Sequence, residues 1–200
     1  MSKENREKGK ALFVCLYGPA NSGKSTLMYG LGWIMKVMRM SVELIPEYPK
    51  QLVHEGRYVT LDIAQDYIFA KHHKMWKMLK NKYRIVVAEA TLVNSLLYLK
   101  EDEIGAEEFK AYVLKCNEGY HTLNFFIEPG DLPFDSAGRT QTSMEQIEAE
   151  GIEFKRKLNE YGIKYQILTS KSNFFEAILL LASVIKSVKE EVKKIENENV

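Results

Sequence analysis

The sequence predicts an α/β domain built on a parallel β-sheet, and two observations support this fold class. Five apolar runs of strand length alternate with stretches of helical character, which is typical of strand–helix–strand units and a parallel sheet. A glycine-rich loop also lies between the first apolar run and a helical segment, in the order that a phosphate-binding loop requires. The five expected strands are Leu12–Tyr17, 41–46, 84–88, 122–127 and 165–168.

The loop after the first expected strand reads Gly18-Pro19-Ala20-Asn21-Ser22-Gly23-Lys24-Ser25-Thr26 and fits the pattern G-x-x-x-x-G-K-[ST]. The residues that follow it, 26–35, are expected to form a buried helix. Glycines let successive N–H groups turn inward around a phosphate, and the helix N-terminus adds partial positive charge. Lys24 is expected to reach the β- and γ-phosphates, and Ser25 to ligate Mg²⁺. The residues expected to contact the nucleotide are Gly18, Asn21, Ser22, Gly23, Lys24, Ser25 and Thr26.

Two further segments repeat apolar residues at the spacing of one helix face. The first contains Leu61, Ala64, Ile68, Met75 and Leu79. The second, near the end of the chain, contains Phe174, Ile178, Leu181, Ile185, Val188 and Val192. This second segment predicts a last helix packed on the sheet, with a coiled-coil seam as the alternative.

Residues 128–142 are punctuated by proline, glycine and aspartate, so we expect a loop after the fourth strand. A helix should open next, with Thr142 or Ser143 as its N-cap. A long loop in a compact domain is often a mobile lid or a binding loop. Arg139 lies in this segment, and a lid guanidinium can neutralise charge on a transferring phosphoryl group. A solvated surface arginine is the alternative interpretation.

Length and composition predict one domain over residues 11–192, with a disordered tail at 1–10 and a frayed end at 193–200. The formal net charge of +1 provides no global field that would attract nucleic acid. The charged first ten residues lack the apolar core of a signal peptide, and no apolar run approaches the roughly 20 residues that span a bilayer. The two scattered cysteines form neither a disulfide framework nor a zinc motif. A cytoplasmic location with no membrane partner is therefore expected.

Two carboxylates follow expected strands: Glu47 follows the second and Glu89 the third. In an open parallel sheet, ligands bind beyond the carboxyl ends of the strands, so both residues should face the same crevice as Lys24. A kinase needs Mg²⁺ beside the phosphates and a group that orients or deprotonates the attacking hydroxyl. We expect Glu47 to accept the proton of the acceptor hydroxyl, and Glu89 to hold the hydration shell of Mg²⁺ or to activate a nucleophile. A solvated strand end or a helix N-cap is the alternative for either residue.

Basic residues outside the loop have two interpretations. Arg57 could contact substrate or phosphate, or it could form a surface ion pair. Lysines recur at three-residue steps at Lys71, Lys74, Lys77 and Lys80, which makes a stripe that spirals over about half of a helix. Such a stripe is more often a solvated face than a track for a nucleic-acid backbone.

Several short motifs resemble one group of phosphate-loop proteins, the nicotinamide-riboside-kinase-like ATPases. This group includes the kinase domain of bacterial NadR-type proteins and many bacteriophage proteins. The resemblance spans roughly residues 12–168 and rests on the phosphate loop, Pro46-Glu47-Tyr48, Gln65 and Gly138-Arg139-Thr140-Gln141. It implies a nucleotide-kinase-like core of five parallel strands in the order 2-3-1-4-5, with helices on both faces and a lid loop.

The resemblance also implies ATP-dependent phosphorylation of a ribosyl or nucleoside hydroxyl. ATP and Mg²⁺ would be the cofactors, and a small nucleoside-like molecule the acceptor. Glu47 matches the acidic base that related nucleoside kinases carry after the second strand, and Arg139 matches their lid arginine. Relatives commonly have aspartate at the end of the third strand, where this chain has Glu89.

Two alternative functions remain open from the sequence. One is a kinase that phosphorylates a hydroxymethylated pyrimidine in DNA, as some similar phage proteins do, with the lysine stripe along the strand. The other is an ATP-dependent switch or binding module without a small-molecule acceptor. The acceptor itself and the oligomeric state are not fixed by the sequence.

Overall fold

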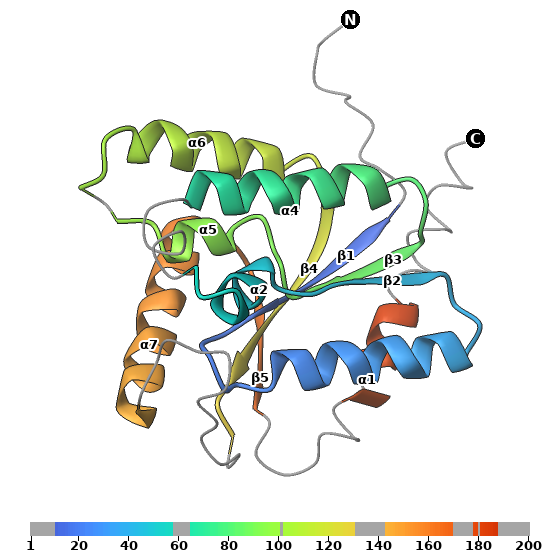
Figure 1. The fold of residues 1–200 in the computed structure, drawn as a ribbon. Coiled ribbons are helices and arrows are strands. Elements are labelled where there is room, and N and C mark those ends of the chain that lie inside the picture. Colours follow the sequence, from blue (N-terminus) through green and yellow to red (C-terminus); the bar gives the residue numbers. More distant parts are fainter. Residues whose placement is uncertain are drawn as a thin grey trace, which may run out of the picture.

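The computed structural model describes residues 11–57, 65–100, 102–130, 143–169, 178–179 and 181–187. Within these residues, five parallel strands form one sheet in the order β2-β3-β1-β4-β5 (Figure 1). The strands are β1 Leu12–Tyr17, β2 Val42–Ile45, β3 Ile85–Ala88, β4 His121–Glu128 and β5 Gln166–Thr169. The predicted parallel sheet and its 2-3-1-4-5 order are therefore confirmed.

Strand β1 lies at the centre of the sheet, and every residue in it is buried. It pairs in parallel with β3 and β4, so that Leu12 is in register with both Ile85 and His121. Its side chains alternate between two core clusters, with Cys15 on one face of the sheet and Val14 on the other. A strand covered on both faces reads as a continuous apolar run, which is why β1 is recognisable from its sequence.

Helices cover both faces of the sheet (Figure 1). Helices α4, α6 and α7 contribute buried side chains to one face, where the Trp76 ring stacks on Phe13 at a centroid distance of 4.1 Å. Helix α1 covers the other face. The helices are α1 Lys24–Val37, α2 Tyr48–His54, α4 Gln65–Leu79, α5 Asn94–Leu97, α6 Ala106–Asn117 and α7 Met144–Glu160.

The expected last helix is described at residues 178–179 and 181–187, all of which are helical. Ile178, Leu181 and Ile185 are buried in the same core cluster as Leu27 and Met28 of α1. This contact places the segment against the sheet, as the apolar spacing predicted, and not in a coiled-coil seam. The other members of the predicted face lie outside the described residues.

Helix α4 differs from its predicted face. Ile68 and Leu79 are buried as expected, but Met75 is 39% exposed. The buried face is centred on His72 and Trp76, and a helix turns about 100° per residue, so Met75 falls at the edge of that face. The prediction counted apolar residues alone and therefore missed a face built around histidine and tryptophan. The earlier members of the predicted set precede the described part of α4.

Several boundaries shift by one or two residues. Helix α1 begins at Lys24, before its predicted start, because Gly23 adopts the left-handed conformation at its N-cap, with φ 87°. Glu128 was expected to begin the loop but is the last residue of β4. The predicted tails at 1–10 and 193–200, and residues 131–142 of the predicted lid, lie outside the described residues. In the part of the chain that the structure describes, no helix combines the length and apolar character needed to cross a bilayer.

The two cysteines are free thiols in different surroundings. Cys15, in β1, is fully buried, and this burial raises the pKa of its thiol well above the usual range. Cys116, near the end of α6, is half-buried.

Candidate phosphate-binding site

The backbone between β1 and α1 depends on its two glycines. Gly18 has φ +139°, and a Cβ there would lie 2.4 Å from the carbonyl oxygen of Ile127. Gly23 is the left-handed N-cap of α1, and no side chain among the described residues caps the helix at this end. The first N–H groups of α1 are therefore left for a ligand, as at other helix N-termini that bind phosphate.

Lys24 is buried in the loop that it belongs to. Its ammonium group donates hydrogen bonds to the carbonyl oxygens of Gly18, at 2.9 Å, and Pro19, at 2.7 Å. An ammonium group has three N–H donors, so these two bonds do not exhaust its capacity to bind a phosphate oxygen. The lysine thus binds the backbone of the first two loop residues. Its positive charge stays within the loop, where it would attract a nucleotide.

Ser25 and Glu89 are joined directly. The Ser25 hydroxyl donates toward the carboxylate of Glu89, whose two oxygens lie 2.8 Å and 3.0 Å away. Ser25 stands in the first turn of α1, and Glu89 follows β3 and is only 5% exposed. The two residues that the sequence linked to Mg²⁺ are therefore neighbours.

The donor set around Ser25 suits Mg²⁺. Among the described residues, no group of three or more His, Cys, Asp or Glu side chains is placed to hold a metal ion. Mg²⁺ usually takes one or two protein oxygen ligands and completes its shell with phosphates and water. A hydroxyl beside a buried carboxylate, at the N-terminus of α1, provides oxygens of this kind.

Glu47 lies at the carboxyl end of β2, as the N-cap residue of α2, and is half-buried. No capping hydrogen bond from its side chain is present in the described structure, so the carboxylate is not committed to the helix. Burial raises the pKa of Glu47 from 4.5 to about 7. The positive charge of Lys24 lowers this pKa, whereas the negative charges of Glu89 and Glu150 raise it. Glu47, after β2, therefore interacts electrostatically with Lys24, after β1, and with Glu89, after β3.

Helix α7 also contacts the phosphate loop, which the sequence reasoning missed. A carboxylate oxygen of Glu150 accepts a hydrogen bond from the N–H of Ala20 at 3.1 Å. At the next residue, a Cβ on Gly151 would lie 3.3 Å from Cγ of Pro19, so the helix backbone passes close to the loop. Glu150 is therefore a further charged residue at the site.

The spacing of apolar residues in α7 could have identified Glu150 as a residue on the buried face of this helix. Ile147, Gly151 and Phe154 are buried on this helix. Glu150 comes three residues after Ile147 and four before Phe154, so it shares their face. A charged residue within an apolar face needs a polar partner, and here the loop supplies one.

Tyr98, at the C-cap of α5, faces the same carboxylates. Its ring packs edge-on against Phe154 of α7 at a centroid distance of 5.1 Å. Enclosure of its hydroxyl raises the pKa of Tyr98 well above the usual range, and the charges of Glu150 and Glu47 raise this pKa further. Tyr98 is still 45% exposed, so part of the residue remains accessible to solvent near these carboxylates.

The other predicted basic residues lie elsewhere. Arg57 forms an exposed ion pair with Glu55 at 3.3 Å, in line with the surface alternative. The Lys71 ammonium lies 5.7 Å from the ring centroid of Tyr48 and 5.1 Å from that of Tyr67. Arg139 lies outside the described residues.

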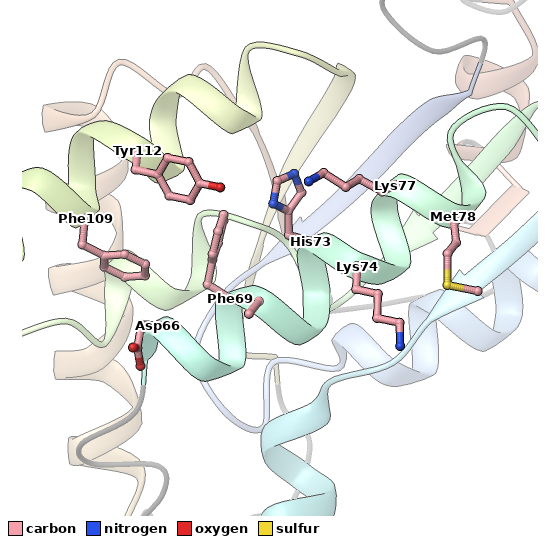
Figure 2. Close-up of a pocket in the computed structure, with 9 residues that line it drawn as sticks. Asp66, Phe69, His73, Lys74, Lys77, Met78, Phe109 and Tyr112 are labelled. Carbon is pink, nitrogen blue, oxygen red and sulfur yellow. The ribbon is translucent and has the colours of Figure 1, made fainter.

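Lys74 and Lys77 border an open groove of about 660 Å³ between α4 and α6. Figure 2 shows Phe69 and His73 of α4 opposite Phe109 and Tyr112 of α6. Lys71 lies over Tyr48 of α2 and Tyr67 of α4, whereas Lys74 and Lys77 line the groove, so the lysines of the stripe have different surroundings. None of the groove-lining residues belongs to the phosphate loop or to the strand-end carboxylates.

A strand–loop–helix unit that starts from the central strand of a 2-3-1-4-5 parallel sheet, with its lysine bonded to the loop backbone, defines a P-loop domain with the fold of P-loop kinases. The sequence matches the family model AAA_28, described as an AAA domain, over residues 13–175. The chain belongs to this family.

Solved structures share the fold. Deoxyadenosine kinase from M. mycoides, with the products dCMP and a flexible dCDP, is similar with a TM-score of 0.54 and 14% identity, over 88% of this chain and 99% of that one. The same kinase with bound dATP has a TM-score of 0.54 and 16% sequence identity, over 87% of this chain and 98% of the kinase. NadR protein in complex with NR has a TM-score of 0.57 and 18% sequence identity. The similarity covers 84% of this chain and 49% of NadR, so this chain spans about half of that protein. None of the curated proteins matches the sequence.

Proposed function

We propose that this protein is an ATP-dependent kinase that transfers the γ-phosphoryl group to a hydroxyl of a nucleoside-like or ribosyl small molecule. One observation carries the proposal: the Glu47 carboxylate interacts electrostatically with Lys24 of the phosphate loop and with Glu89, which accepts a hydrogen bond from Ser25 of the same loop. The similarity in fold to deoxyadenosine kinase and NadR supports the choice of acceptor class.

In this proposal, the loop amides and Lys24 hold the phosphates of the nucleotide. Charge-assisted hydrogen bonds from an ammonium and from helix N–H groups are well suited to this task. Ser25, with Glu89 beside it, would hold Mg²⁺, which supplies charge neutralisation on the phosphates when bound. Arg139, from the predicted lid, would add a further positive charge during transfer.

Glu47 is the proposed base. A carboxylate with a pKa of about 7 is substantially ionised at neutral pH and still basic enough to take a proton from an attacking hydroxyl. Its electrostatic interaction with Lys24 supports this role, and so does the lack of a capping bond from its carboxylate to α2 within the described residues.

The test is to incubate the protein with Mg²⁺ and ATP and a panel of nucleosides, nicotinamide riboside, mononucleotides and DNA with modified bases. The expected result is a small nucleoside-like molecule that gains the mass of one phosphate. Lys24→Ala should weaken ATP binding by at least about tenfold, because it removes charge-assisted hydrogen bonds. Lys36→Ala, in the last turn of the same helix, is the matched control and should leave the affinity unchanged.

Other outcomes point to other functions. Phosphorylated DNA without any phosphorylated small molecule would favour a nucleic-acid kinase. ADP release with no phosphorylated product would favour a nucleotide-driven switch. A protein without Mg²⁺-dependent nucleotide affinity would contradict the proposal as a whole.

A further inference from the structure

The backbone around Glu89 is held by neighbouring elements of the fold. The N–H groups of Glu89 and Ala90 both donate to the carbonyl oxygen of Ile45, the last residue of β2, at 3.0 Å and 3.2 Å. The carbonyl oxygen of Ala90 accepts a hydrogen bond from Nε1 of Trp76, on α4, at 3.0 Å. The segment that follows β3 is therefore tied to β2 on one side and to α4 on the other.

The carbonyl group of Glu89 is held by Asn94, the first residue of α5. Nδ2 of Asn94 donates to this carbonyl oxygen at 3.0 Å, and the N–H of Thr91 donates to the same oxygen at 3.1 Å. A carbonyl oxygen can only accept hydrogen bonds, so the amide nitrogen of Asn94, and not its amide oxygen, must face Glu89. The contact thus requires one orientation of the Asn94 side chain.

Thr91 holds Asn94 in that orientation. The Thr91 hydroxyl donates to Oδ1 of Asn94 at 2.9 Å and accepts from the N–H of Asn94 at 3.1 Å. Thr91 is fully buried and Glu89 is 5% exposed, so water competes little for these hydrogen bonds. Both polar groups of the Asn94 side chain are therefore used within the segment that begins at Glu89.

This network ends at a carboxylate that meets the phosphate loop. The two carboxylate oxygens of Glu89 lie 2.8 Å and 3.0 Å from the Ser25 hydroxyl, so small changes in the Glu89 backbone would break the contact. Groups that hydrogen-bond the residues of a metal site set the geometry of those residues and, through it, the affinity for the metal. Asn94 has this relationship to Glu89.

We propose that Asn94 is a positioning residue that orients Glu89 toward Ser25 and thereby sets the Mg²⁺ requirement of ATP binding. This inference rests on the proposed function, in which Ser25 and Glu89 hold Mg²⁺. Without the Asn94 amide, the Glu89 carbonyl loses a donor and the backbone at Glu89 gains freedom. The carboxylate then spends less time beside Ser25, and more Mg²⁺ is needed to fill the site. Asn94 touches neither the metal nor the nucleotide and acts only through Glu89.

The first experiment measures the Mg²⁺ concentration required for half-maximal ATP binding in the wild-type chain and in Asn94→Ala. This concentration should rise by about threefold to tenfold, near the lower limit for outer partners of metal ligands, and by no more than in Glu89→Gln. Asn124→Ala is the matched control, because Nδ2 of Asn124, on β4, also donates to a backbone carbonyl, that of Lys164, at 2.9 Å. The control should keep the wild-type Mg²⁺ requirement.

A double variant separates positioning from stability. In the Glu89→Gln background, Asn94→Ala should change the Mg²⁺ requirement by less than about twofold, because the carboxylate that Asn94 orients is already absent. The melting temperature should fall by a similar amount in both backgrounds, since the same hydrogen bonds are lost. An equal rise in the Mg²⁺ requirement in both backgrounds would show that Asn94 does not act through Glu89, and the inference would be overturned.

Thr91 offers a second route that leaves Asn94 in place and decides the question even if Asn94→Ala does not fold. Thr91→Val keeps the shape of the side chain and removes the hydroxyl, so it should raise the Mg²⁺ requirement as Asn94→Ala does. Thr91→Ser keeps the hydroxyl and should resemble the wild type. The same Mg²⁺ requirement in Thr91→Val and Thr91→Ser would contradict the role of this network.

The two proposals fail in distinguishable ways. ATP binding with a wild-type Mg²⁺ requirement in Asn94→Ala and Thr91→Val overturns the positioning role of Asn94 and leaves the proposed function standing. Absence of Mg²⁺-dependent ATP binding in the wild-type chain, with its fold confirmed by circular dichroism, overturns both.

Discussion

The hydroxyl of Ser25 lies 2.8 Å and 3.0 Å from the two oxygens of the Glu89 carboxylate, and so joins the start of α1 to the end of β3. The two residues lie in the segments that follow β1 and β3, which are neighbouring strands in the sheet. The contact links the phosphate loop to the carboxyl edge of the sheet, and it would change whenever a metal ion enters.

This relationship predicts the effect of Glu89→Gln. The neutral amide can still accept from Ser25, so the fold should be retained, but the charge beside the proposed Mg²⁺ site is lost. The Mg²⁺ concentration required for half-maximal ATP binding should rise about tenfold, as for other groups that support a metal ligand. Titration of ATP binding with Mg²⁺ measures this shift, and Glu108→Gln on α6 is the exposed control. An unchanged Mg²⁺ requirement would remove Glu89 from the metal site.

The pKa of Glu47 predicts how activity depends on pH. A base must be ionised to take a proton, and burial holds the pKa of Glu47 at about 7. The kcat/KM of the proposed phosphoryl transfer should therefore rise with pH and level off above about 7, because this parameter reports the free enzyme. Glu47→Gln should abolish transfer with little change in ATP affinity. Transfer that persists in this variant would assign the base to another residue.

The same pKa predicts how stability depends on pH. The folded-state pKa lies above the ordinary value of 4.5, so the folded protein holds this proton more tightly than the unfolded chain. The contribution of Glu47 to stability therefore falls as pH rises from about 4.5 to about 7, and stays lower above that range. Glu47→Gln should flatten this slope and give a higher melting temperature than the wild type at pH 8 without ligand. A lower melting temperature at pH 8 would contradict the burial of the charge.

The surroundings of Gly18 predict that this position of the phosphate loop tolerates no side chain. Its φ of +139° is unfavourable for other residues, and a Cβ would meet the carbonyl oxygen of Ile127 at 2.4 Å. Gly18→Ala should lower the free energy of unfolding by more than about 2 kcal/mol, measured in urea. Gly162→Ala is the matched control, since its φ is also positive, at +69°, but no atom of the described residues lies within 4 Å of the new Cβ. That variant should lose only about 1 kcal/mol. Equal losses in both would mean that backbone conformation, and not the contact with Ile127, limits the loop.

The sequence predicted the parts of the fold that short-range physics determines. Strand β1 is buried on both faces, so its apolar run is continuous and easily recognised. The strand-end rule then placed Glu47 and Glu89 beside Lys24 without any knowledge of distances. The prediction of the buried face of α4 was partly wrong, because His72 and Trp76, which were not among the predicted residues, lie at the centre of that face.

Glu150 shows what local reasoning misses. It lies 130 residues from Ala20 in the sequence, and their contact depends on how α7 crosses the end of the sheet. The spacing of Ile147 and Phe154 marks the position of Glu150 on the helix, but not the element that this face meets. Such long-range pairing follows from the packing of the whole domain, and for this reason the residue was not among the predicted site residues.

The difference between the two thiols makes the wild-type chain convenient for labelling. Cys15 is sealed inside β1 and holds its proton tightly, so it should not react with a maleimide while the protein is folded. Cys116 is half-exposed on α6, a helix that contributes no residue to the phosphate loop. One fluorophore per molecule, attached without engineering a cysteine, should therefore report on ligand binding by anisotropy or quenching without modifying the phosphate loop.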